Sequence, residues 1–129
     1  MKTLGKLSLV VVLTMLLSNM LLAQPLENKE YNQYLMKALD DENIGIRTSA
    51  AQLLGERKVV EAVEPLAKML KAEENTSARI VAAMALYQIA DEKGTVALKE
   101  AAAKDKNKTV RRVVTAMVQK LESVELAHK

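Results

Sequence analysis

The sequence predicts an all-α protein, built as a short superhelix (α-solenoid) of antiparallel helix pairs, and three observations lead to this fold class. Aromatic residues make up only 2% of the 129 residues, and there are only four Gly and two Pro. β-Sandwiches and barrels depend on aromatic and β-branched strands separated by frequent turns, so this composition disfavours them. Apolar residues also recur with helical spacing. Finally, the pattern repeats along the chain, as in stacked helical repeats.

The first 23 residues have the layout of a secretory signal peptide. Lys2 and Lys6 form a basic start, residues 7–22 are almost entirely apolar, and Ala23 closes the segment. Cleavage would leave a soluble exported protein, periplasmic or secreted, that begins with a linker over residues 24–30. The alternative is an uncleaved anchor, because about 17 apolar residues is the short limit for crossing a bilayer. In that case the membrane would be contacted through this segment alone.

Three polar columns then repeat at a spacing of 32 residues. They consist of the arginines Arg47, Arg79 and Arg111, the asparagines Asn43, Asn75 and Asn107, and the acids Asp41, Glu73 and Asp105. Such a period predicts about two and a half repeats. The repeat domain, 31–126, divides into the second helix of a partial repeat (31–40), two full repeats (41–72 and 73–104) and a half repeat (105–121) with a tail.

The elements follow in order. The segment 31–39 is expected to be a second helix that lacks its partner, with Leu35 and Leu39 aligned to Leu66 and Leu70. Each Asn precedes an apolar-periodic run and can cap it, so first helices are predicted to start at Ile44, Thr76 and Lys108. The expected core face of the helix after Asn43 comprises Ile46, Ala50, Leu53 and Leu54.

Second helices are predicted over 60–71 and 95–104. Pro65 is tolerable in the first turns of a helix, and residues 91–94 are expected to form a turn. The last helix, 108–121, carries an apolar stripe that includes Val118. The residues after Leu121 are too few for a turn and another helix, so this stripe is expected to be a contact surface.

The repeats resemble HEAT-like repeats of the short type found in phycobilin lyases. The resemblance is carried by NIGIRTSAAQLLGERKVVEAVEPLAKML (43–70), by NTSARIVAAMALYQIADEKGTVALKEAA (75–102) and by the half copy NKTVRRVVTAMVQKL (107–121). Tyr87 and Gln119 depart from the pattern where the first copy has Gly55. The resemblance implies an α-solenoid whose repeats are recognition surfaces, and it does not imply lyase chemistry.

The arginine column has two interpretations. The preferred one is a structural ladder in which each Arg reaches the acid of its own or a neighbouring inter-repeat loop; the alternative is an anion-binding row. The asparagines are interpreted as helix caps, although Asn75 and Asn107 also begin glycosylation sequons.

Catalytic chemistry has few residues to draw on. The chain has no Cys and one His, which excludes a cysteine nucleophile, a thiolate metal site and a histidine-based triad. No catalytic, metal-binding or cofactor-binding residue is therefore predicted, and the protein is not expected to be an enzyme. Two of the 19 Lys and Arg residues lie in the leader, so the remaining chain has 17 basic and 16 acidic side chains. This near-neutral balance disfavours nucleic-acid binding.

The sequence thus predicts an exported, non-enzymatic interaction module or scaffold of the cell envelope whose partner is another protein. Its expected contact residues are Glu64, Lys68, Lys99 and Glu100 on the second helices, with Arg112 and Val118 on the last helix, where weak self-association or an acidic partner is expected. One alternative is an accessory subunit or chaperone of a cofactor or chromophore enzyme. The other is nucleic-acid binding through the basic residues of 104–112.

Overall fold

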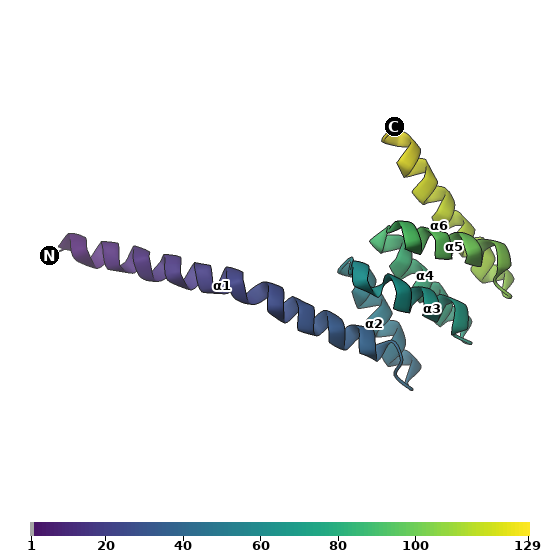
Figure 1. Ribbon diagram of the computed structural model, residues 1–129, viewed down its shortest axis with the longest axis horizontal. Helices are drawn as coiled ribbons and strands as arrows, with labels where there is room; N and C mark the ends of the chain where they lie inside the picture. The colour runs from purple at the N-terminus through teal and green to yellow at the C-terminus, as the bar shows by residue number, and fades with distance from the viewer. Residues whose placement is uncertain (1) are drawn as a thin grey trace. The chain divides into compact units, whose positions relative to one another are not determined.

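The computed structural model describes the backbone of residues 2–129 and the side chains of residues 8–16 and 28–129. Its elements, over the part described, are all helical, which confirms the all-α fold class (Figure 1). They are α1 (Lys2–Ala38), α2 (Ile44–Glu56), the 3₁₀ turn η1 (Val60–Ala62), α3 (Val63–Ala72), α4 (Thr76–Ile89), α5 (Glu92–Lys104) and α6 (Lys108–Ala127).

The chain divides into two compact units, Met1–Gln33 and Tyr34–Lys129. The first unit consists of α1 up to Gln33, so the expected linker 24–30 is helical. Its apolar side chains at 9–13, 15 and 16 are all at least 50% exposed. Over the residues that the structure describes, no helical stretch combines the length and the apolarity that a membrane crossing requires.

The second unit is a two-layer stack of helices. One layer contains α2, α4 and α6, and in it α4 packs against both α2 and α6. In the other layer α3 packs beside α5. The layers meet where α3 lies on α4 and where α5 lies on α4 and α6. This arrangement of antiparallel pairs is the predicted α-solenoid.

The predicted starts of the first helices are confirmed at Ile44, Thr76 and Lys108. The side-chain oxygen of the Asn before each start accepts a backbone N–H of the first turn, at 2.8 Å from Gly45, 3.0 Å from Ala78 and 2.8 Å from Thr109. The expected turn at 91–94 is wrong, because Asp91 caps a helix that already begins at Glu92. The last helix also continues past Leu121 to Ala127.

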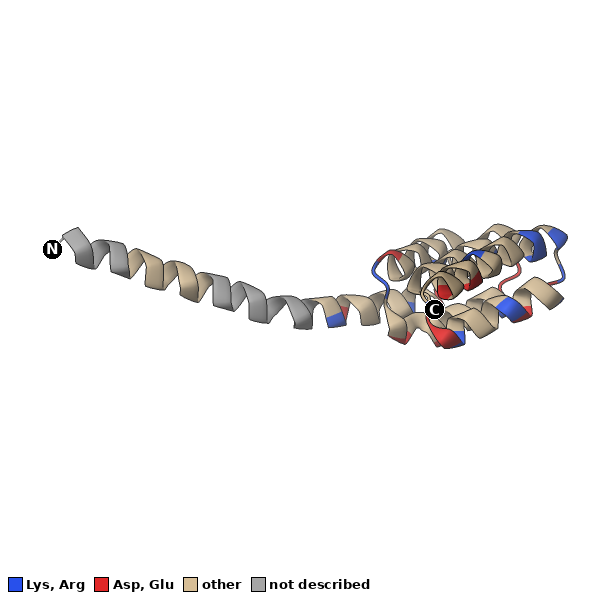
Figure 2. Ribbon diagram, turned by 90° about the horizontal axis from the view of Figure 1, so that it is seen from above, with Lys and Arg blue, Asp and Glu red and all other residues tan. Residues whose placement is uncertain are grey.

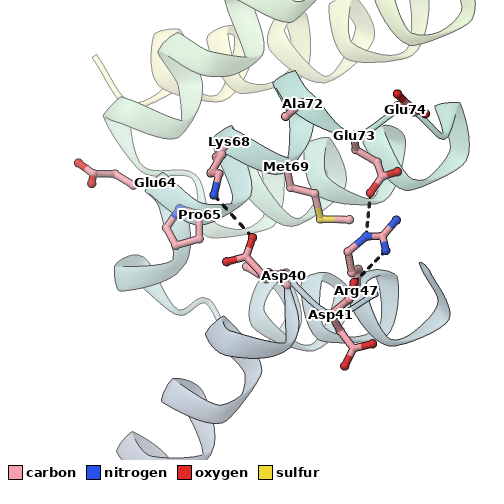
Figure 3. Close-up of a pocket in the computed structure, with 11 residues that line it drawn as sticks. Asp40, Asp41, Arg47, Glu64, Pro65, Lys68, Met69, Ala72, Glu73 and Glu74 are labelled. Atoms are coloured by element: carbon pink, nitrogen blue, oxygen red, sulfur yellow. Dashed lines mark hydrogen bonds and ion pairs between the residues drawn. The ribbon is translucent and has the colours of Figure 1, made fainter. Parts of the chain in front are cut away.

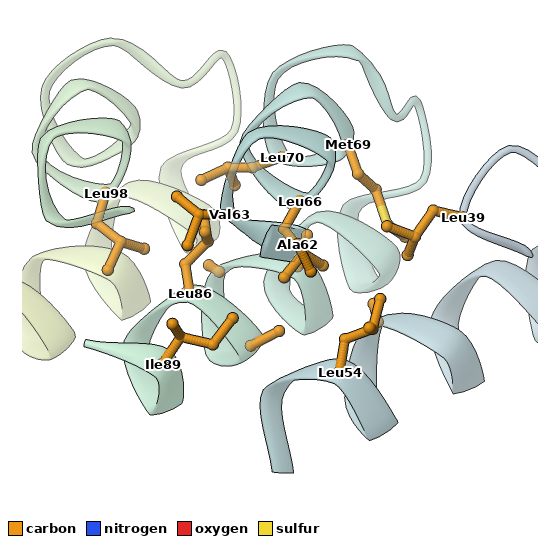
Figure 4. Close-up of a cluster of buried hydrophobic side chains, with 14 of the residues drawn as sticks. Leu39, Leu54, Ala62, Val63, Leu66, Met69, Leu70, Leu86, Ile89 and Leu98 are labelled. Carbon is orange, nitrogen blue, oxygen red and sulfur yellow. The ribbon is translucent and has the colours of Figure 1, made fainter. Parts of the chain in front are cut away.

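The core lies between the two layers and is built from aliphatic side chains (Figure 4). Leu54 and Leu86 from one layer meet Leu66 and Leu98 from the other, and each of these four is 0% exposed. Leu35 and Leu39, which the sequence aligns with Leu66 and Leu70, are also buried. Because burying a leucine contributes about 2 kcal/mol, such side chains stabilise the stack without aromatic residues.

Two sequence assignments to the core or surface are wrong. Ile46 was expected in the core but is 44% exposed, whereas its repeat equivalents Ala78 and Val110 are fully buried. α4 and α6 each pack on the preceding first helix, and α2 has no such neighbour in the described part of the chain. Val118 was expected at a contact surface but is only 9% exposed, because α6 packs on both α4 and α5.

The first-helix layer changes its spacing along the stack. A Cβ atom placed on Gly55 of α2 would lie 2.6 Å from the Cα atom of Ala85, so the two helices approach as closely as glycine allows. One repeat later the matching pair is Tyr87 and Met117, and these two side chains line a groove of 470 Å³ between α4 and α6. The departure from glycine at Tyr87 therefore coincides with a shallow surface groove where the preceding pair of helices has a close backbone contact.

Candidate functional site

Each ladder arginine donates hydrogen bonds to backbone carbonyls in the loop of its own repeat. Nη1 of Arg47 donates to the carbonyl oxygens of Asp41 and Glu42, both at 2.9 Å. Nη1 of Arg79 donates in the same way to Glu73 at 2.8 Å and Glu74 at 3.0 Å. These carbonyls precede the Asn caps, so the arginines fix the loop from which each first helix starts.

The same arginines reach forward to the acid of the following repeat. Nε of Arg47 lies 2.9 Å from Oε2 of Glu73, and Nε of Arg79 lies 3.1 Å from Oδ2 of Asp105. A second bond joins Nη2 of Arg79 to Oδ1 of Asp105 at 3.2 Å, so this pair is bidentate. The sequence pattern left open which loop supplies the acid; the structure pairs Arg47 and Arg79 with the acid of the following repeat.

The acids in turn hold the helix caps. The backbone N–H groups of Asn43, Asn75 and Asn107 donate to Asp41, Glu73 and Asp105 at 2.8, 3.1 and 2.8 Å. The hydrogen bond from Arg47 lowers the pKa of the Glu73 carboxyl below its usual value, although burial acts in the opposite direction. One connected set of bonds therefore runs from an Arg through an acid to the next Asn.

Arg111 differs from the two arginines before it. Its one described hydrogen bond from the guanidinium goes to the carbonyl oxygen of Asp105, and within the described residues it forms no ion pair. Over the part of the chain that the structure covers, the ion pair with the following repeat is thus present at Arg47 and Arg79 only.

Beside the Arg47–Glu73 pair, the first rung of the ladder, lies a groove of 680 Å³ between the turn at 39–41 and α3 (Figure 3). Its sides carry Asp40, Glu64 and Glu74, together with the paired Arg47 and Glu73. Nζ of Lys68 reaches Oδ1 of Asp40 at 3.6 Å across it. The groove is therefore mainly acidic.

A second groove of 580 Å³ lies between α3 and α5, beside the Arg79–Asp105 pair, which is the second rung of the ladder. Ala67, Leu70, Ala97 and Ala101 provide its apolar floor, and four lysines, Lys68, Lys71, Lys104 and Lys106, line its sides. Lys68 belongs to both grooves, so they are neighbours on one face. Figure 2 marks the Lys and Arg positions in blue and the Asp and Glu positions in red along the ribbon.

The predicted contact residues of the second helices are all exposed, and each forms an ion pair with another helix or turn. Besides Lys68 with Asp40, these pairs are Glu64 with Lys93 at 3.5 Å, Glu100 with Lys71 at 3.9 Å and Lys99 with Glu122 at 2.9 Å. Such exposed pairs contribute about 1 kcal/mol or less each, so a partner can replace them at low cost.

The two predicted contact residues of α6 differ in their exposure. Arg112 is exposed and lines the groove between α4 and α6, whereas Val118 is in the core. Sequence reasoning missed both the second groove and the backbone carbonyls bound by the arginines. The carbonyls stand five and six residues before Arg47 and Arg79, and six before Arg111, a spacing that carries no side-chain signal.

The described residues contain no cluster of three His, Cys, Asp or Glu side chains that could hold a metal ion. In a comparison with known protein families, the model of HEAT repeats matches residues 32–119. No curated protein matches the chain. The matched range spans the stacked helix pairs, both complete rungs and both grooves of the second-helix layer.

Proposed function

The chain belongs to the HEAT-repeat family, and from this premise we propose that it is an exported scaffold or interaction module of the cell envelope that binds another protein. HEAT repeats serve in protein–protein interaction, and the family is typically non-catalytic. The observation that carries the proposal is the face formed by α3, α5 and the turn at 39–41, where two grooves lie side by side. A stacked solenoid presents such a face as an extended, rigid binding surface.

The export part of the proposal is supported by the N-terminal sequence. A basic start, the apolar stretch 7–22 and the small residue Ala23 form the three regions of a signal peptide. The apolar side chains at 9–13, 15 and 16 are exposed, as expected of a segment that the export machinery binds. A protein released by cleavage of this segment would act outside the cytoplasm.

We propose that the polar ladder stabilises the stacking of the helix pairs and does not bind the ligand. Its acids and arginines satisfy one another and the loop backbone, and in the described residues no buried side-chain polar atom lacks a partner. A buried charge network of this kind fixes how neighbouring helix pairs stack. No enzymatic role is proposed.

Site-specific photo-crosslinking in the producing cells tests the binding surface. A photoreactive amino acid replaces Lys68 or Glu100 on the grooved face, and matched variants carry it at Thr115 or Gln119, exposed positions of α6 in the other layer. We expect the same defined crosslinked protein from both positions of the grooved face and none from the two control positions. Crosslinks that are absent, or that form equally at all four positions, would reject this surface.

A further inference from the structure

The two grooves of the second-helix layer are the same site in successive repeats. Shifting the lining residues of the first groove by 32 positions gives residues of the second: Arg47 becomes Arg79, Met69 becomes Ala101 and Glu73 becomes Asp105. The rungs at their ends are also alike. Differences between the grooves therefore reflect the side chains that each repeat places on a common backbone.

The charge of the two grooves is opposite. Five acidic and two basic side chains line the first groove, whereas five basic and two acidic side chains line the second. The change arises at equivalent positions, since Ala72 and Glu74 of the first groove correspond to Lys104 and Lys106 of the second. One repeat step thus converts an acidic groove into a basic one.

Both acids of the second groove already form ion pairs, whereas two of its lysines form none with a described residue. Asp105 is held by Arg79, and Glu100 lies 3.9 Å from Lys71. Lys104 and Lys106 are exposed and form no ion pair with any described residue. The groove therefore presents positive charge that is free to take carboxylates from a ligand.

The floor of the second groove suits a polypeptide. Ala67, Ala97 and Ala101 are small, and Ala101 stands where the first groove has Met69, so a backbone with short aliphatic side chains can lie close to the helices. A site built for a free phosphate would instead direct buried, unpartnered donors at one point, and no such side-chain atom exists in the described part of the chain.

We propose that the groove between α3 and α5 binds an acidic segment of the partner protein, with its carboxylates between the lysines of the two sides and its small apolar side chains on the alanine floor. This inference rests on the proposed function and adds the chemistry of the ligand. The acidic first groove repels the same segment, so it fixes which of the two equivalent grooves the segment occupies.

The test measures the fluorescence anisotropy of a short labelled peptide with a repeating Glu-Ala-Leu-Glu sequence against the protein in the form that cells produce. We expect binding that weakens as salt rises, because the lysines are exposed to solvent. Lys104→Glu/Lys106→Glu should weaken binding by about tenfold or more, and the neutral pair Lys104→Gln/Lys106→Gln should weaken it by a smaller factor. Far-ultraviolet circular dichroism checks that each variant is folded.

The matched control is Lys37→Glu/Lys120→Glu, which makes the same change of charge at two exposed positions outside the second groove and should leave binding unchanged. The inference is overturned if the control weakens binding as much, or if a peptide with Lys in place of Glu binds as well. It is also overturned if sedimentation shows that a second copy occupies the groove in preference to the peptide, or if only phosphatidylglycerol vesicles bind. If any of these results appears while the crosslinks at Lys68 and Glu100 persist, the binding face stands and only its ligand chemistry is wrong.

Discussion

The Nε atom of Arg79 lies 3.1 Å from Oδ2 of Asp105, and the two side chains are only 2% and 8% exposed. Arg79 also donates to the carbonyls of Glu73 and Glu74. This one guanidinium therefore joins two successive inter-repeat loops inside the protein.

Arg79→Ala is expected to destabilise the fold by about 3–5 kcal/mol, because it leaves the Asp105 carboxylate enclosed without its partner. Arg111→Ala is the matched control: it removes the bond to the Asp105 carbonyl and no described ion pair, so about 1 kcal/mol is expected. Urea unfolding followed by circular dichroism measures both changes. An equal decrease in unfolding free energy for the two variants would show that the ion pair between Arg79 and Asp105 contributes little.

Glu73 should give the protein a pH-dependent part of its stability. Its carboxyl pKa is lowered in the folded state, chiefly by the hydrogen bond from Arg47. The contribution is therefore fully present above the unfolded-state pKa, about 4.3, and is lost as the pH falls through the lower folded-state value. The free energy of unfolding of Glu73→Gln should fall less steeply below about pH 4 than that of the wild type. If the free energy of unfolding depended on pH in the same way for the two proteins, this account would be contradicted.

Gly55→Ala should destabilise the protein despite the gain in helix propensity of about 1 kcal/mol. The new Cβ atom would lie 2.6 Å from the backbone Cα atom of Ala85, so α2 and α4 must separate. We expect a net loss of about 1–3 kcal/mol in thermal or urea unfolding.

Gly45→Ala in the same helix provides the comparison, since its new Cβ atom would meet only the side-chain oxygen of Asn43, at 3.1 Å. This variant should be near neutral or slightly stabilised. A Gly55→Ala protein as stable as Gly45→Ala would mean that the two first helices are not in tight contact.

The export proposal predicts the mass of the protein recovered from outside the cytoplasm. Cleavage after Ala23 should give a chain that starts at Gln24, and intact-mass spectrometry distinguishes this product from the full chain. Replacing Ala23 with a bulky residue should slow processing, because the peptidase requires a small side chain there. Recovery of a membrane-bound protein that retains Met1 would favour the anchor instead.

Local features of the fold could be predicted from the sequence more fully than contacts between helices. The starts at Ile44, Thr76 and Lys108 follow from Asn side chains that bond within their own first turn. The exposure of Ile46 and the burial of Val118 depend on which helix lies alongside, and a single amphipathic pattern does not specify that neighbour.

The candidate site shows the same division. The columns of Arg and acid were visible as a period in the sequence, but the direction of each pair depends on how one repeat stacks on the next. The basic groove between α3 and α5 combines Lys68 and Lys71 with Lys104 and Lys106, which lie more than thirty residues apart in the chain. Only the packing of two helices brings these lysines together.

The bonds that run from Arg79 to Asp105 and on to Asn107 have a consequence for cooperativity. The acid that braces the cap of α6 is held by a side chain of α4, so the start of one helix depends on the repeat before it. In a linear array this adds to the coupling between nearest neighbours and leaves the intrinsic stability of each repeat unchanged. Partly unfolded forms in which one repeat melts alone become rarer, and hydrogen exchange in α4 and α6 is expected to report the same opening event.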